Sequence, residues 1–249
     1  MRARNDPGFI EFLMKIGNGE ERVNCQGQIR IPQPMLIPYT SIEQSIESLI
    51  SSVYPDMSLF EKCPFEMVQQ AILCPKNEFV DDFNSKLIQR IQGNEVVYIS
   101  DDRAKNVMDQ GDYVDYLNSL EPRGLPQNRL VLKVNCPVIL LRNINPVEGL
   151  SNGTRLIFKR ISPLILRQIS LRLCFVMTIN KLQGQMLDYV GMYLRQPVFT
   201  HGQLYVALSR AKTGENVNIL IVPPTFNDPG TEYTRNVVYT EVLAKESLK

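Results

Sequence analysis

The feature that most constrains the fold is a strand–helix–strand succession that begins near residue 70. Residues 71–75 (AILCP) form a short apolar run, and residues 76–94 form an amphipathic helical pattern that Gly93 ends. Residues 95–100 (EVVYIS) have the composition of a second strand. Because this order of elements favours a parallel sheet flanked by helices, the sequence predicts an α/β protein.

The rest of the chain extends this prediction on both sides. Residues 172–177, 188–194 and 216–222 are further apolar strands, and residues 201–211 form a helix between the last two. Residues 129–160 instead contain three β-rich runs with tight connections, one of them entered through Asn152-Gly153, a hairpin signal. We therefore expect a small antiparallel β unit inserted into the α/β body. Most of the first sixty residues have helical periodicity.

Composition excludes several classes of function. The chain has 27 Lys and Arg against 26 Asp and Glu, so its net charge of +1 does not indicate wholesale polyanion binding. The longest uncharged run, between Arg195 and Arg210, has 14 residues, too few for a membrane span. A single histidine and five scattered cysteines without a C-x-x-C pair predict no metal site. We find no apolar signal core and expect an intracellular protein without a membrane partner.

Two polar segments stand out from the packing pattern. Residues 178–185 (TINKLQGQ) follow a buried strand, and Gly184 would let backbone N–H groups approach a phosphate. Residues 202–214 form a helix that delivers Arg210 at its C-terminal end, where a guanidinium could reach phosphate oxygens. Each segment also has an ordinary explanation. The first can be the polar start of a surface helix, and in the second the helix dipole favours an arginine at the C-terminal end.

Together, these two segments resemble motifs five and six of superfamily-one helicases. The order is a strand, TINKLQGQ, one further strand and then HGQLYVALSR. This order is most similar to that of the Pif-type 5′-to-3′ DNA helicases, including the helicase portions of Helitron transposons. The similarity extends over most of the chain, since ILCPKNEFVDDFN and residues 125–156 also have counterparts in that family. The segments DPGFIEFLMKIGNGE and IRIPQPMLIPYT have family counterparts as well.

The resemblance implies a domain organisation. It predicts a RecA-like, parallel-sheet second motor lobe over residues 66–116 and 171–225, with a small and shortened antiparallel β-barrel insert over residues 117–170. Residues 1–65 would be a helical lead-in that continues from a missing N-terminal motor lobe. Residues 226–249 would be a C-terminal tail, either a peripheral helix or partly disordered.

The resemblance also implies roles for individual residues. Arg210, and Arg2 near the start of the chain, would be the arginines that contact the γ-phosphate of ATP, which the complete family enzyme uses with Mg²⁺. The nucleotide side of motif five would be lined by Gln183, Gly184 and Gln185. Single-stranded DNA would be contacted by Thr178, Asn180 and Lys181. His201 would be a further DNA contact, with a helix-start histidine bonded to backbone as the alternative.

Several features depart from a complete motor. No Gly-Lys dipeptide occurs in the chain, so the phosphate loop G-x-x-x-x-G-K-[ST] is absent. Asp101 and Asp102 follow an apolar strand as in a Walker B motif, but without a phosphate loop we interpret them as a solvated strand end. Asp81 and Asp82 are interpreted as exposed helix positions. We therefore expect a truncated chain that binds ATP poorly and does not hydrolyse it alone, so whether it acts as an enzyme stays open.

Three hypotheses about the chain follow from these observations. The first is the second motor lobe of an ATP-dependent DNA helicase, with the nucleus, or else the mitochondrion, as its location. The second is a non-catalytic module that binds single-stranded nucleic acid, and the third is a non-functional, transposon-derived fragment that folds badly. Aromatic residues make up 8% of the chain and form no base-stacking platform that the sequence reveals.

Overall fold

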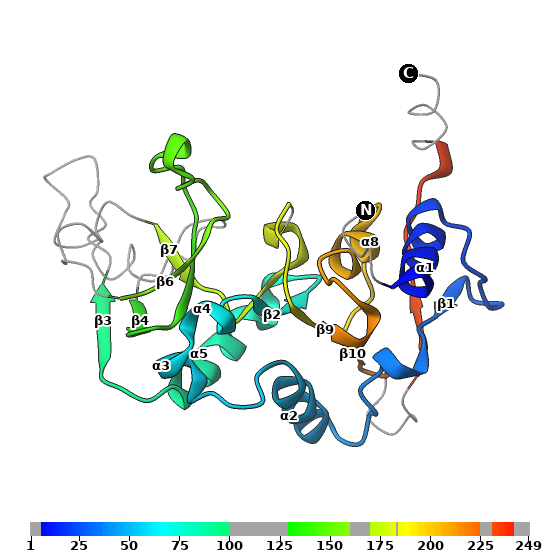
Figure 1. Ribbon diagram of the computed structural model, residues 1–249. Coiled ribbons are helices and arrows are strands. Elements are labelled where there is room, and N and C mark those ends of the chain that lie inside the picture. Colours follow the sequence, from blue (N-terminus) through cyan, green and yellow to red (C-terminus); the bar gives the residue numbers. More distant parts are fainter. Residues whose placement is uncertain (1–5, 100–128, 160–169, 183, 225–230, 242–249) are drawn as a thin grey trace, which may run out of the picture. The chain divides into compact units, whose positions relative to one another are not determined.

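The computed structural model describes residues 6–99, 129–159, 170–182, 184–224 and 231–241, which form two compact units (Figure 1). The first unit consists of Met1–Asp56, Gln69–Val80 and Val176–Lys249. The second unit consists of Met57–Val68 and Asp81–Phe175. The chain therefore leaves the first unit and returns to it twice.

A parallel sheet forms the centre of the first unit. Its strands lie in the order β10 (Val217–Ile221), β9 (Tyr189–Leu194), β2 (Gln70–Cys74) and β8 (Val176–Thr178), and each pairs with its neighbour in parallel. Most of their side chains are buried, as expected for a parallel sheet whose strands are near-continuous apolar runs. The predicted α/β class with a parallel sheet is confirmed.

Helix α2 (Ile42–Val53) packs against β9, β10 and β2 (Figure 1). It begins at Ser41, whose hydroxyl accepts a hydrogen bond from the backbone N–H of Gln44 at 3.3 Å, a helix N-cap. The helix approaches the sheet most closely at Gly191, where a Cβ atom would lie 2.7 Å from Cγ2 of Val53. Only glycine therefore fits at this point of β9.

The ends of the described chain meet in the first unit. Helix α1 (Pro7–Asn18) is followed by β1 (Gln28–Arg30), which pairs antiparallel with β11 (Tyr233–Arg235), and the short helix α8 (Gln203–Leu208) packs against α1. The predicted peripheral helix is wrong for residues 233–235, which form strand β11. Strand β11 is too short to be seen in the sequence, and it forms because its backbone pairs with β1 and the Glu232 carboxylate binds Arg30.

The described residues of the second unit form two antiparallel sheets and three α-helices. Strands β3 (Glu95–Ile99) and β4 (Arg129–Lys133) form one sheet, and β6 (Arg155–Ile157), β5 (Pro137–Leu140) and β7 (Leu171–Leu173) form the other, in that order. The helices are α3 (Leu59–Lys62), α4 (Pro64–Met67) and α5 (Val80–Arg90), of which the last begins in the first unit. The described part of residues 129–160 thus has the predicted antiparallel strands.

Short 3₁₀ helices connect several of these elements in both units. They are η1 (Gln33–Met35), η2 (Asn77–Phe79), η4 (Pro146–Glu148), η5 (Ile179–Leu182) and η6 (Gly214–Asn216).

Strand β3 corrects the sequence prediction. We expected residues 95–100 to continue the parallel sheet, but β3 pairs antiparallel with β4 instead. The side chains of Val96 and Val97 are 37% and 43% exposed, whereas most of β2 is buried. Val96 and Val97 point to opposite faces of β3, so neither face is fully covered, whereas the strands of a parallel sheet are covered on both faces.

A second correction concerns residues 172–177, which the sequence predicts as one strand. The segment divides into β7, which pairs antiparallel with β5, and β8, which pairs in parallel with β2. The two are separated at Cys174 and Phe175, whose side chains are fully buried, and the Phe175 ring packs edge-on against Phe60 at 5.4 Å between centroids. Because most residues of this segment are buried, its hydrophobic pattern does not reveal where one strand ends and the next begins.

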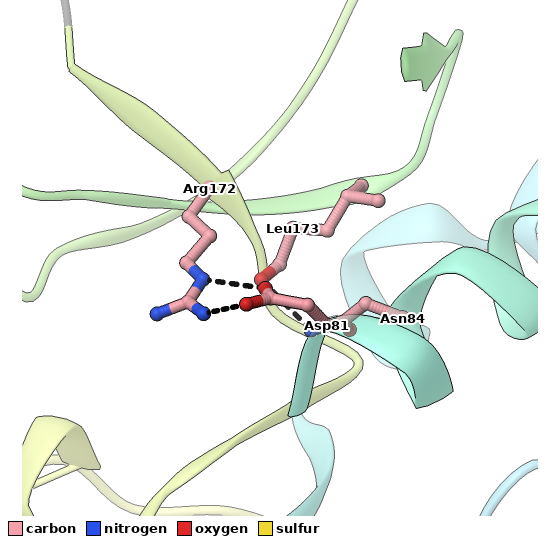
Figure 2. A network of polar contacts seen from close by, with 4 residues as sticks. All are labelled: Asp81, Asn84, Arg172 and Leu173. Atoms are coloured by element: carbon pink, nitrogen blue, oxygen red, sulfur yellow. Dashed lines mark hydrogen bonds and ion pairs between the residues drawn. The ribbon is translucent and has the colours of Figure 1, made fainter. Parts of the chain in front are cut away.

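The N-terminal turn of α5 is anchored to β7 by polar contacts (Figure 2). Asp81 forms a two-pronged ion pair with Arg172, in which Nε of Arg172 donates to Oδ1 of Asp81 at 2.9 Å. Nδ2 of Asn84 donates to the backbone oxygen of Leu173 at 3.3 Å. The interpretation of Asp81 as an exposed helix position is therefore wrong: its carboxylate is a structural partner within the second unit.

Candidate functional site: the edge of the parallel sheet

Residues 179–182 of the predicted polar segment form a tight turn at the carboxyl end of β8. The 3₁₀ helix η5 (Ile179–Leu182) buries Ile179 and Leu182, which fix the turn to the unit. Asn180, between them, is exposed, and Lys181 is partly exposed. The apolar residues thus hold the backbone in place while the polar residues face solvent.

Gly184 continues this turn in a left-handed conformation. Its φ is +89°, and a Cβ atom there would meet no atom within 4 Å. The position is open, so its glycine serves the backbone conformation rather than a close contact within the chain. The backbone N–H of Gln185 then donates to the oxygen of Leu182 at 3.2 Å and closes the turn.

Arg210 lies just beyond the C-terminal end of α8 and reaches the same turn. Its guanidinium donates from Nη1 to the backbone oxygen of Gln185 at 3.0 Å, from Nε to the oxygen of Val206 at 2.9 Å, and from Nη2 to the Ser209 hydroxyl at 3.0 Å. In addition, the backbone N–H of Leu187 donates to the oxygen of Arg210 at 3.0 Å. The two predicted polar segments therefore meet through Arg210.

Helix α8 sets the position of Arg210. Leu204, Ala207 and Leu208 are fully buried, as the sequence predicts, and α8 packs against η5. A six-residue helix has little stability of its own, so this packing is what holds it in place. The arginine is thereby presented by a rigid element rather than by a loose loop.

Several predicted site residues lie outside the described part of the chain. These are Arg2, Gln183, Asp101 and Asp102. The described members of the predicted set are Thr178, Asn180, Lys181, Gly184, Gln185, His201 and Arg210.

His201 is held by the C-terminal segment. Its Nδ1 accepts a hydrogen bond from the backbone N–H of Tyr239 at 2.9 Å, and its ring stacks on the Tyr239 ring with 5.4 Å between centroids. The neighbouring Gly202 donates its N–H to the oxygen of Val237 at 2.9 Å. The contacts of Nδ1 agree with the alternative of a helix-start histidine bonded to backbone, and a DNA-binding role for His201 remains a prediction.

Gln203 is a residue that sequence reasoning missed. It is 2% exposed, and its Oε1 accepts hydrogen bonds from the backbone N–H groups of Phe199 and Thr200 at 3.0 and 3.4 Å. Its Nε2 lies 3.5 Å from the oxygen of Pro75, just beyond β2. An amide on the buried face of an apolar helix is the signal that could have identified it, because buried polar groups require partners.

Asp6 connects the start of α1 to the loop after Arg210. Its Oδ1 accepts from the backbone N–H of Phe9 and its Oδ2 from that of Gly214, both at 2.9 Å. The N–H of Gly214 and then that of Phe9 hold the pKa of the Asp6 carboxyl below its ordinary value of 3.8. The charged carboxylate therefore stabilises this end of the first unit.

We expect Asp6→Asn to reduce the free energy of unfolding by about 1 kcal/mol near neutral pH, because both backbone bonds favour the charged form. A carboxyl group whose pKa is lowered by folding stabilises the folded protein at pH values above its ordinary pKa. This stabilisation is lost as the pH falls through the lowered pKa. The difference between wild type and variant in thermal unfolding should thus shrink as pH falls below about 3.8. A difference that stays constant down to pH 2 contradicts this role.

A shallow hollow lies at the same edge of the sheet. It is lined by Cys74, Pro75, Lys76, Phe79, Tyr193, Arg195 and Gln196, and its volume is about 220 Å³. This volume includes space open to solvent, so the hollow is a surface depression rather than an enclosed pocket. Within the described ranges, no group of three or more His, Cys, Asp or Glu side chains could hold a metal ion, and no helix there is long and apolar enough to cross a membrane.

Comparison with known proteins gives consistent similarities. The family model described as "DNA helicase Pif1, 2B domain" matches residues 115–161, which overlap the predicted insert. The human ATP-dependent DNA helicase PIF1 is 35% identical over 104 residues, which cover 42% of this chain and 14% of that protein. The chain thus matches only a small part of the length of this curated relative.

Solved structures share the fold. The crystal structure of Pif1 helicase from Candida albicans has a TM-score of 0.58 at 21% identity, covering 100% of this chain and 58% of that one. A Bacteroides Pif1 helicase in complex with ADP-AlF3 and ssDNA has a TM-score of 0.54 at 18% identity, covering 98% and 54%. These matches agree in showing that this chain is similar to Pif1-type DNA helicases over part of their length, and the solved structures show that it shares their fold.

Proposed function

We propose that this chain is the second motor lobe of an ATP-dependent 5′-to-3′ DNA helicase. The observation that carries the proposal is the hydrogen bond from Nη1 of Arg210 to the backbone oxygen of Gln185. It joins the end of α8 to the polar turn after β8, so the two helicase-like segments form one structural unit. A motor lobe needs this coupling, because nucleotide contact and DNA contact must move together.

On the nucleotide side, Arg210 would contact the γ-phosphate of ATP held by another lobe, with Arg2 as a second such arginine. Gln183, Gly184 and Gln185 would line the same side. A guanidinium is a permanently charged planar fork that suits phosphate oxygens, and this one is held in position by backbone oxygens before any ligand arrives. This set consists of arginines, glutamines and a glycine, whose guanidinium, amide and backbone N–H groups suit phosphate oxygens rather than a metal ion.

On the DNA side, Thr178, Asn180, Lys181 and His201 would contact single-stranded DNA. Asn180 and Lys181 project from a turn whose backbone is anchored by buried apolar residues. The near-zero net charge means that the DNA-binding surface must be local, since phosphate contact requires clustered Lys and Arg. The ssDNA bound by the Bacteroides relative supports this choice of ligand.

We further propose that the chain alone does not hydrolyse ATP. Without Gly-Lys there is no phosphate loop in its 249 residues, and an arginine finger acts only on a nucleotide that another element holds. ATP and Mg²⁺ would belong to the two-lobed enzyme. That enzyme would act in the nucleus or the mitochondrion.

The absent phosphate loop also favours a second candidate, a non-catalytic module that binds single-stranded nucleic acid. This candidate shares the DNA-binding turn but gives Arg210 no role in ATP hydrolysis. A non-functional fragment would lack both properties, and it would also lack a cooperative thermal unfolding transition, which the hydrogen-bonded core described above should produce.

The experiment is a titration of the purified chain with a fluorescein-labelled oligo(dT) strand, followed by anisotropy at about 50 mM salt. We expect binding that weakens with salt, and Lys181→Ala should reduce the slope of log affinity against log salt by about 0.7, the value for one phosphate contact on a single strand. Lys15→Ala, on the outer face of α1, is the control and should change nothing. Absence of binding at this salt contradicts both DNA-binding candidates.

A further inference from the structure

A group of aromatic and cationic side chains lies at the same edge of the parallel sheet as the polar turn. Its members, which we call the edge cluster, come from β9, from the segments just after β2 and β9, and from the segment before α8: Lys76, Phe79, Tyr193, Arg195 and Phe199. None of them belongs to the helicase-like segments that the sequence singled out for nucleotide or DNA contact.

The inner part of the edge cluster is built on a buried tyrosine. The Tyr193 side chain is 1% exposed, and its ring packs edge-on against Phe79 with 5.8 Å between centroids. The guanidinium carbon of Arg195 lies 5.0 Å from the centroid of the Phe79 ring. A cation at this distance from a ring face is attracted to it, so Arg195 is held at the surface although its side chain is exposed.

The outer part of the edge cluster presents an accessible ring. Phe199 is 50% exposed, and Nζ of Lys76 lies 5.8 Å from its centroid. Gln203 fixes this arrangement, because it binds the backbone N–H of Phe199 and approaches the oxygen of Pro75, the residue before Lys76. The backbone segments that carry Phe199 and Lys76 are therefore held by a buried amide.

Strand register places the edge cluster next to the polar turn. Cys74, the last residue of β2, is the direct partner of Thr178, the last residue of β8. Lys76 lies two residues beyond Cys74, and Asn180 and Lys181 follow Thr178. Since the carboxyl ends of neighbouring parallel strands share one edge of the sheet, both groups face the region where α/β proteins bind ligands.

The chemistry of the edge cluster indicates its ligand. Two cations suit phosphate groups and an exposed ring suits a nucleobase, the combination by which proteins bind single-stranded nucleic acid. Lys76 is near the outer limit of about 6 Å for attraction to a ring, so a base can displace it from Phe199 and leave its ammonium for a phosphate. The hollow is a surface depression, so it does not enclose a free nucleotide.

We propose that Phe199 stacks a base of single-stranded DNA while Lys76 and Arg195 bind its phosphates, which extends the DNA path from the turn after β8 across the ends of β2 and β9. This inference rests on the proposed function, since it names a further part of the same DNA-binding surface. Glu78 on η2 is an exposed carboxylate between Lys76 and Phe79 in the sequence.

The test compares two labelled strands of equal length, oligo(dT) and an abasic sugar-phosphate strand, by anisotropy with the full chain. Phe199→Ala should weaken oligo(dT) binding about tenfold, an effect typical of one stacked base, and leave abasic binding unchanged. Lys76→Gln and Arg195→Gln should each reduce the salt slope by about 0.7 with both strands. Phe65→Ala, a more exposed phenylalanine in the second unit, is the matched control and should change neither.

Two results would overturn the proposal. If Phe199→Ala affects both strands equally, or neither, while Lys181→Ala still weakens binding, then the edge cluster is not a DNA contact and the proposed function stands. If the wild-type chain binds neither strand at about 50 mM salt, the proposed function fails, and this inference with it. Thermal unfolding of each variant separates lost binding from lost folding, because Phe199 is half exposed and its truncation should leave the core intact.

Discussion

Replacement of Arg210 by alanine is expected to lower DNA-stimulated ATP hydrolysis by about 10³–10⁵-fold in an enzyme that joins this chain to a lobe carrying a phosphate loop. In the transition state, negative charge spreads over the oxygens of the transferred phosphoryl group, and the arginine stabilises that charge. Arg210 also donates to the backbone oxygen of Gln185, so its truncation removes this side-chain hydrogen bond to the polar turn. The measurement is steady-state ATP hydrolysis with saturating single-stranded DNA.

Two variants separate the chemical role from the structural one. Arg210→Lys keeps a positive charge but loses the planar fork, so it should recover only a small part of the activity. Arg30→Ala removes an exposed arginine that pairs with Glu232, and it should leave hydrolysis unchanged. If Arg210→Ala retains more than a tenth of wild-type turnover, Arg210 is not an arginine finger.

Gly191→Val is expected to reduce the free energy of unfolding by about 3 kcal/mol, since overpacking a tight core commonly has this cost. A Cβ atom at Gly191 would lie 2.7 Å from Cγ2 of Val53 and 3.0 Å from Cγ1 of Ile72, closer than real side chains approach. Helix α2 would have to move away from β9, and the sheet edge that carries the polar turn would be disturbed with it. Urea unfolding followed by circular dichroism measures the loss.

Gly8→Ala provides the control for this substitution. Gly8 lies in the first turn of α1, and a Cβ atom there would come no closer than 3.8 Å, to Oδ1 of Asp6. Because alanine favours a helix over glycine, this variant should unfold at the same or a slightly higher urea concentration. Equal stability of Gly191→Val and wild type would show that α2 does not pack on the sheet as described.

The sequence predicts those elements whose signal is local. Residues 71–74 are uniformly apolar and lie in the buried parallel strand β2. Phe83, Leu87 and Ile91 recur every four residues, and all three are buried along α5 and just after its end. Strand β3 was assigned to the wrong sheet because its partner, β4, is contributed by residues 129–133. Strand composition does not specify a partner, and β11 pairs with β1 from the opposite end of the sequence.

The candidate site likewise contains some residues that the sequence predicts and others that it does not. The polar turn and Arg210 follow from short motifs, because each motif carries its residues within one stretch of chain. The roles of Gln203, Phe199 and Lys76 could not be predicted, since they depend on β2 lying beside β8 and β9 in the sheet. The aromatic side chains belong to different segments of the sequence and are brought together by that strand order.

The central claim, that this chain is the second lobe of a helicase motor, is tested most directly by DNA-stimulated ATP hydrolysis. The rate is measured for the chain alone, for a phosphate-loop lobe of a Pif1-type relative alone, and for the two joined. We predict no hydrolysis by this chain and strong, DNA-dependent hydrolysis by the joined protein that Arg210→Ala abolishes. Hydrolysis by the chain alone that Arg210→Ala removes, or a joined and folded protein no faster than the phosphate-loop lobe by itself, would contradict the account.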